Sequence, residues 1–74
     1  MDAFFRRNIG EWIFSFYQRS SEENRLFGHA DVYLGTELQC RIVLAKDHGC
    51  EDELCAALNE KCVAWLKDWE GRHT

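Results

Sequence analysis

The sequence predicts an α+β fold, in which a three-stranded antiparallel β-meander is covered on one face by a C-terminal amphipathic α-helix (βββα). Three features predict it: alternating apolar residues in mid-chain, a hairpin signal at Gly35-Thr36, and an apolar stripe with helical spacing near the C-terminus. A chain of 74 residues suffices for one small domain, 1–74, with a limited core.

The first predicted strand spans 11–19. The segment 12–17 is rich in aromatic residues, and Gly10 and a polar stretch bound it, which favours a strand. The same region also contains residues with helical spacing, namely Phe5, Ile9, Trp12 and Phe16. An N-terminal helix over about 3–19, followed by a hairpin and the C-terminal helix, is therefore the alternative. We favour the strand because two strands alone would make a poor sheet.

The second and third predicted strands span 26–34 and 37–46, and Gly35-Thr36 between them suits a tight turn. In the last strand every second residue is apolar: Leu38, Cys40, Ile42 and Leu44. This alternation is typical of a half-buried strand.

The predicted helix spans 51–69. Its apolar residues recur at intervals of three and four: Leu54, Leu58, Cys62, Trp65, Leu66 and Trp69. Acidic residues at 51–53 suit a helix N-terminus, Lys67 suits the last turn, and Gly71 can adopt the left-handed conformation that ends many helices.

The helix is expected to cover one face of the sheet, and Gly28 would let it approach closely. The covered face should hold Trp12, Phe14, Phe16, Ala30, Val32, Leu34, Leu38, Cys40, Ile42 and Leu44. The open face should hold Ile13, Ser15, Tyr17, Arg19, Phe27, His29, Asp31, Tyr33, Gln39, Arg41 and Val43. Either residues 3–5 or a second chain would have to cover this open face.

Composition and charge argue against several function classes. The net charge is −4, and the acidity is concentrated in 47–74, so binding to a phosphate backbone is disfavoured. No apolar run approaches the ~20 residues that span a bilayer, and no export signal is evident. We therefore expect a small acidic cytoplasmic protein, without a membrane or nucleic-acid partner.

The sequence contains no recognisable catalytic, cofactor or metal site. Ser15, His29 and Asp31 share the open face, but residues side by side on a flat sheet do not form a nucleophile, base and pocket. The four cysteines, Cys40, Cys50, Cys55 and Cys62, have no Cys-x-x-Cys spacing. We expect free thiols, no metal or other cofactor, and no enzymatic activity.

The helix sequence Asp52-Glu53-Leu54-Cys55-Ala56-Ala57-Leu58, with Trp65-Leu66-Lys67-Asp68 further on, resembles the corresponding helix of HicB-type antitoxin domains. The resemblance covers under a third of the chain, so it assigns no family. It would imply a partner protein that this chain neutralises.

These observations favour a non-catalytic protein-interaction module, self-associating as a homodimer through the open face or an edge strand. The predicted interaction surface consists of Tyr17, Phe27, His29, Tyr33, Arg41 and Val43. The alternatives are a small RNA-binding sheet and an antitoxin-like inhibitor of a partner protein.

Overall fold

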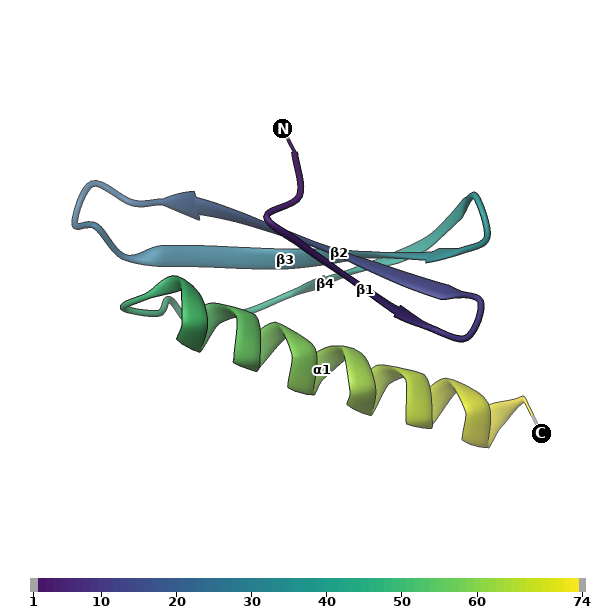
Figure 1. The fold of residues 1–74 in the computed structure, drawn as a ribbon. Coiled ribbons are helices and arrows are strands. Elements are labelled where there is room, and N and C mark those ends of the chain that lie inside the picture. The colour runs from purple at the N-terminus through teal and green to yellow at the C-terminus, as the bar shows by residue number, and fades with distance from the viewer. Residues whose placement is uncertain (1, 74) are drawn as a thin grey trace.

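A computed structural model of the chain describes residues 2–73 and has two layers, an antiparallel sheet and one helix beneath it (Figure 1). The elements in chain order are β1 (Phe5–Ile9), β2 (Trp12–Ser20), β3 (Leu26–Leu34), β4 (Glu37–Val43) and α1 (Glu51–Arg72). The α+β architecture is confirmed, but the sheet has four strands where three were predicted. Residues 1 and 74 of the predicted domain lie outside the described residues.

The strand that sequence reasoning missed is β1, at one edge of the sheet. It pairs with β2 from Phe5 opposite Phe16 to Ile9 opposite Trp12, through a two-residue turn in which Gly10 has φ +60°. The alternative of a helix over 3–19 is therefore wrong. The apolar residues with helical spacing belong to two strands that face each other across the turn.

The remaining strands follow the meander order, so the sheet reads β1-β2-β3-β4. Gly35 has φ +64° and closes the predicted tight turn between β3 and β4. β4 ends at Val43, earlier than the predicted residue 46, although the Leu44 amide still donates to the Gly28 carbonyl at 3.2 Å.

A bulge in β4 corrects one residue of the predicted covered face. Val32 pairs with Cys40 but Tyr33 pairs with Leu38, so Gln39 is the additional residue. The shift places Leu38 with Tyr33 on the open face, where Leu38 is 56% exposed. Strict alternation predicts that Leu38 lies on the covered face with Cys40, and the inserted residue breaks that alternation.

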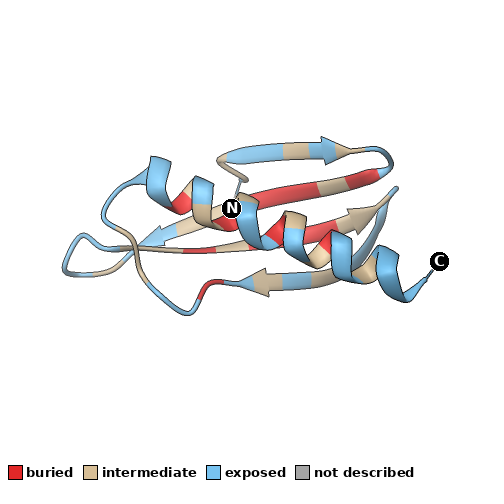
Figure 2. Cartoon of the chain, turned by 90° about the horizontal axis from the view of Figure 1, so that it is seen from below, coloured by how far each residue is buried: buried red, intermediate tan, exposed pale blue. Residues whose placement is uncertain are grey.

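The core lies between α1 and the sheet (Figure 2). Its buried apolar residues are Trp12, Phe14, Phe16, Ala30, Val32, Leu44, Leu54, Leu58, Cys62 and Leu66. A Cβ atom on Gly28 would lie 2.7 Å from Leu54 Cδ1, so the expected close approach at this glycine is confirmed. The rings of Trp65 and Trp69 pack edge-on against Trp12 at 5.2 and 5.0 Å.

The helix continues to Arg72, beyond the predicted end at residue 69, and Gly71 lies inside it. The His73 amide caps the end by donating to the Trp69 carbonyl at 3.1 Å, and the His73 ring stacks on Trp69 at 4.0 Å. These contacts end the helix without a left-handed residue. Its first turn carries the predicted acidic residues 51–53.

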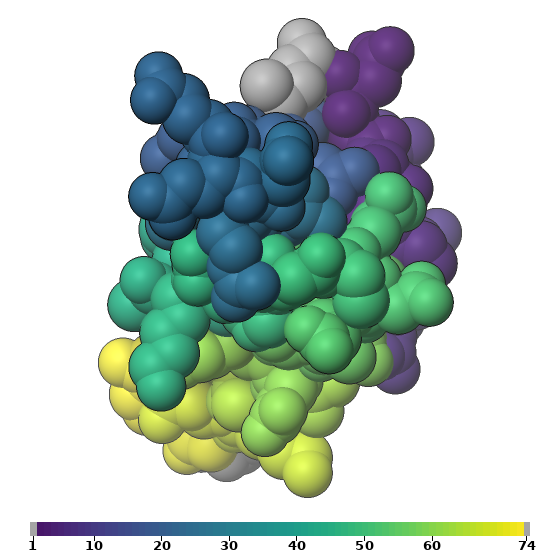
Figure 3. Space-filling view, turned by 90° about the vertical axis from the view of Figure 1, so that its left-hand side faces the viewer, coloured from purple at the N-terminus to yellow at the C-terminus, as the bar shows by residue number. Residues whose placement is uncertain are grey.

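At one end of the molecule, the β2–β3 turn (blue in Figure 3) lies against the segment that leads into α1 (green). Leu26 and His48 exchange two backbone hydrogen bonds of 2.8 Å, and Arg25 forms an ion pair with Asp47 at 3.2 Å. These contacts fix where the helix begins relative to the sheet. Within residues 2–73, no helix has the length and apolar character needed to cross a membrane.

Candidate interaction surface

The six residues of the predicted interaction surface project from the sheet face opposite α1. Tyr17 pairs with His29, and His29 pairs with Val43, so these three residues form one row across β2, β3 and β4. Arg41 pairs with Asp31 in the next row. Phe27 and Tyr33 occupy the same face of β3 because side chains on one face recur at every second position.

The row begins with two stacked rings. The Tyr17 and His29 rings lie 5.0 Å apart with an interplanar angle of 15°. Partial burial lowers the pKa of His29 below its ordinary value, and the nearby Arg41 charge lowers it further. The neutral imidazole is therefore favoured near pH 7. Arg19 extends the aromatic character, since its guanidinium carbon lies 4.9 Å from the Phe27 ring centre.

A polar row crosses the middle of the open face from β1 to β4, formed by Arg6, Ser15, Asp31 and Arg41. Arg6 Nε donates to Ser15 Oγ at 3.2 Å, and Arg41 donates to both Asp31 oxygens at 2.7 and 3.3 Å. Ser15 and Asp31 are only 2% and 7% exposed although no helix covers them. The middle of this face is thus covered by its own side chains.

Arg6 is absent from the predicted surface because no strand was predicted over residues 5–9. The signal that was available is the Gly10-Glu11 pair between Ile9 and Trp12, a two-residue hairpin turn. The aromatic rings of Phe4 and Phe5 lie 6.4 and 5.4 Å from the ring of Phe16, which is fully buried under α1. Phe4 packs against the helix-side core, and Phe5 lies on the same face with 44% of its surface exposed, so neither ring covers the open face.

The exposed apolar part of the open face is on β4. Val43 is 65% exposed and Leu38 is 56% exposed, whereas Phe27, His29 and Tyr33 on β3 are half-buried. The side chain of Arg41 lies between these two positions and is also exposed. Exposed apolar surface of this kind favours contact with another molecule.

β4 is also an edge of the sheet, as is β1, while β2 lies in the interior. The bond from the Leu44 amide to the Gly28 carbonyl identifies Leu44 as a residue whose backbone groups point toward β3. Because antiparallel ladder bonds alternate, Ile42 also points toward β3, and the backbone groups of Arg41 and Val43 point outward. These outward groups lack a ladder partner in the described chain and form a template for another strand.

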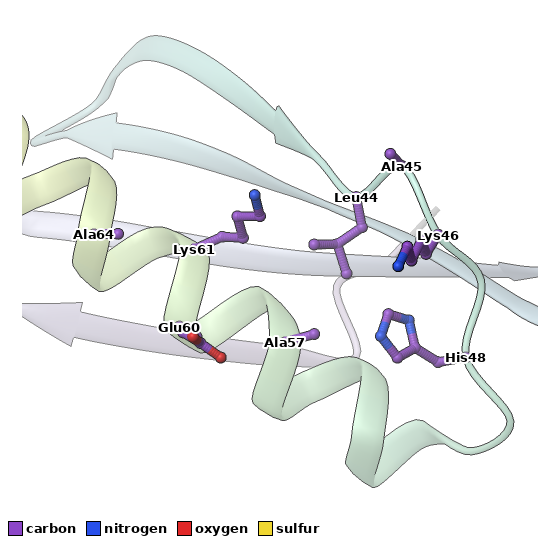
Figure 4. Close-up of a pocket in the computed structure, with 8 residues that line it drawn as sticks. All are labelled: Leu44, Ala45, Lys46, His48, Ala57, Glu60, Lys61 and Ala64. Atoms are coloured by element: carbon purple, nitrogen blue, oxygen red, sulfur yellow. The ribbon is translucent and has the colours of Figure 1, made fainter.

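A groove of about 440 Å³ lies between α1 and residues 44–48, the segment that follows β4 (Figure 4). Its lining is formed by Leu44, Ala45, Lys46, His48, Ala57, Glu60, Lys61 and Ala64. Small side chains from α1 face Leu44 across the groove, with charged groups along the helix. His48 Nδ1 is buried and forms no hydrogen bond with any described residue.

The residues considered for catalysis do not form a reactive arrangement. Ser15 Oγ is buried and accepts the Arg6 hydrogen bond, and His29 Nε2 lies 4.0 Å from the nearer Asp31 oxygen. No group of three or more His, Cys, Asp or Glu residues within residues 2–73 is placed to hold a metal ion.

All four cysteines are free thiols with different surroundings. Cys62 is buried, and this burial raises the pKa of its thiol to about 12. Burial also raises the pKa values of Cys40 and Cys55. Raised pKa values disfavour the reactive thiolate at these three positions.

Comparisons of the chain with protein-family models, with curated proteins and with solved structures found no match.

Proposed function

We propose that this chain is a non-catalytic protein-interaction module that self-associates through the β4 edge and the adjoining part of the open face. The observation that carries the proposal is the coincidence, on β4, of outward backbone groups at Arg41 and Val43 with the exposed apolar side chains of Leu38 and Val43. An added strand would pair the backbone groups and cover the side chains together.

The polar row supports the choice of the edge over the centre of the face. The Asp31 carboxylate is already paired with Arg41, and Ser15 with Arg6, so the middle of the sheet needs no partner to satisfy its polar groups. A cytoplasmic location is part of the proposal and is supported by the four free thiols.

Light scattering over a range of concentrations tests the proposal. The parent chain should show twice the 8.7 kDa mass of one chain at micromolar concentration. Val43→Lys places a charge at the exposed edge and should shift the mass toward one chain, while circular dichroism stays unchanged. Tyr33→Glu, on β3 behind the edge, is the matched variant for a contact through the open face.

A second candidate, a small RNA-binding sheet, is favoured by one specific observation. Arg6, Arg19 and Arg41 project from the same face as the Tyr17–His29 stack, and Asp31 is the acidic residue among them. Cations beside exposed ring systems suit unpaired bases. Retention on RNA that weakens steeply with salt, and that is lost in Arg19→Ala, would favour this candidate over protein binding.

A further inference from the structure

We infer that two copies of this chain pair β4 with β4 in antiparallel orientation, with Ile42 on the two-fold axis and Arg41 opposite Val43 of the partner copy. This inference rests on the proposed self-association and specifies its geometry. It follows from the backbone of the edge, from the charges at its two ends, and from the side chains that each possible register would bring together.

Charge at the ends of β4 favours one orientation, because Asp47, which follows Lys46, is already paired with Arg25 of its own chain. Glu37 begins the strand, and Lys46 follows three residues after its end at Val43. Antiparallel pairing brings Glu37 of each copy to the end where Lys46 of the other lies, whereas parallel pairing would place like charges together. An antiparallel pair is also a closed two-fold arrangement, in which each copy uses the same surface.

The alternating direction of the backbone N–H and C=O groups along β4 restricts the register. A ladder hydrogen bond between the copies must join two residues whose backbone groups point outward, and within the regular part of β4 these residues are Arg41 and Val43. The axis can therefore pass through residue 41, 42 or 43. The axis cannot pass midway between two residues, because each helix-side residue would then lie opposite an open-face residue of the other copy.

Side chains distinguish the three registers. An axis at Arg41 would place the two Arg41 side chains opposite each other and would use Gln39, where the bulge disrupts the ladder. An axis at Val43 would pair Arg41 with Ala45, which lies beyond the end of the strand. An axis at Ile42 uses both outward residues and keeps the two arginines apart.

The Ile42 register also matches apolar residues on the helix side. Ile42 lies opposite Ile42 of the partner copy, and Cys40 lies opposite its Leu44, so two half-buried β4 residues gain an apolar neighbour. The two sheets become one continuous sheet with both helices on the same side. The open faces then form one surface that carries two copies of the Tyr17–His29 stack.

Two variants, each with a matched control variant, test the edge pairing and its register. Val43→Pro removes one outward N–H, which an edge strand tolerates, and should weaken dimerisation at least about tenfold. Val43→Ala keeps the N–H and loses only part of the apolar side chain, so it should weaken dimerisation much less. Residue 42 would face its own copy in a non-hydrogen-bonded pair, with Cα atoms about 4.5 Å apart, close enough for a disulfide. Under mild oxidation, Ile42→Cys should therefore form a covalent dimer well beyond the parent level, and Arg41→Cys should not.

Other outcomes of these experiments would contradict the register, the edge pairing or self-association itself. A dimer that cross-links through Arg41→Cys but not Ile42→Cys overturns the register and leaves self-association standing. A dimer that survives Val43→Pro but is lost in Tyr33→Glu overturns edge pairing and indicates a contact between open faces. A parent chain that remains monomeric overturns both the inference and the proposed function. If Ile42→Cys does not fold, NMR of a mixed isotope-labelled parent decides, because the register requires contacts between Arg41 of one copy and Val43 of the other.

Discussion

Both faces of this sheet carry aromatic and aliphatic side chains, but the two faces bury them in different ways. On the helix side, Phe14, Phe16 and Val32 are completely buried against Leu54 and Leu58. On the open side, half-buried rings surround a polar row, and the most exposed apolar residue, Val43, lies at the sheet edge. The difference indicates that the helix side provides the stability of the fold. On the open side, the large apolar side chains that stay exposed among residues 2–73 belong to β4.

The largest expected effect of a substitution is on the helix side. Leu58 is fully buried, so Leu58→Ala should lower the free energy of unfolding by about 2–5 kcal/mol through lost apolar contact and the cavity left behind. Val43→Ala on the open side should change it by about 0.5 kcal/mol or less. Urea denaturation of the two variants measures the contrast, which must be made at equal chain concentration because association also stabilises. Similar losses in both variants would contradict the division between the two faces.

Gly28 tests how closely the helix approaches the sheet. A methyl group there would lie 2.7 Å from Leu54 Cδ1, so Gly28→Ala should cost about 1–3 kcal/mol in stability. Leu54→Ala removes the obstructing atoms, and the double variant should cost less than the sum of the two single changes. Strictly additive losses in the urea midpoint would show that the helix moves away freely and that the contact is not specific.

His29 gives the smallest expected effect, on the open side. Its pKa is lowered in the folded chain, mainly by burial, so the unfolded chain binds a proton first as the pH falls. Stability should therefore be unaffected by this group above its ordinary pKa of 6.5 and should decrease as the pH falls from 6.5 toward the lowered folded value. Urea midpoints at pH 7.5 and 5.5 for the parent and for His29→Gln measure the effect. An equal decrease in both proteins would assign it to other groups.

The helix, β3 and β4 could be predicted from the sequence because their residues follow simple periods, and β2 could be predicted from its aromatic residues between Gly10 and a polar stretch. Leu54, Leu58 and Cys62 recur at helical spacing, and Ala30 and Val32 alternate along a strand. The helix and the strand each bury one face only, so the spacing of their apolar residues matches the residues that are buried. The predicted bounds of β3, 26–34, are the observed ones for the same reason.

The features that were not predicted are those that do not follow from a regular spacing of apolar residues. β1 is a short edge strand with two arginines, so its residues show no apolar alternation, and pairing with β2 is what makes it a strand. The bulge at Gln39 depends on tertiary geometry and moves Leu38 to the opposite face. The polar row could not be predicted without β1, because Arg6 forms one of its ends.

Amide hydrogen exchange along β4 tests the central claim, that this edge pairs with a second copy, most directly. In a single chain the ladder protects alternate amides, so Ile42 and Leu44 should exchange slowly while Arg41 and Val43 exchange rapidly. The account predicts that at concentrations where the mass is that of two chains all four amides are protected, and that dilution releases Arg41 and Val43 alone. Rapid exchange at Arg41 and Val43 at every concentration, beside slow exchange at Ile42, would contradict it.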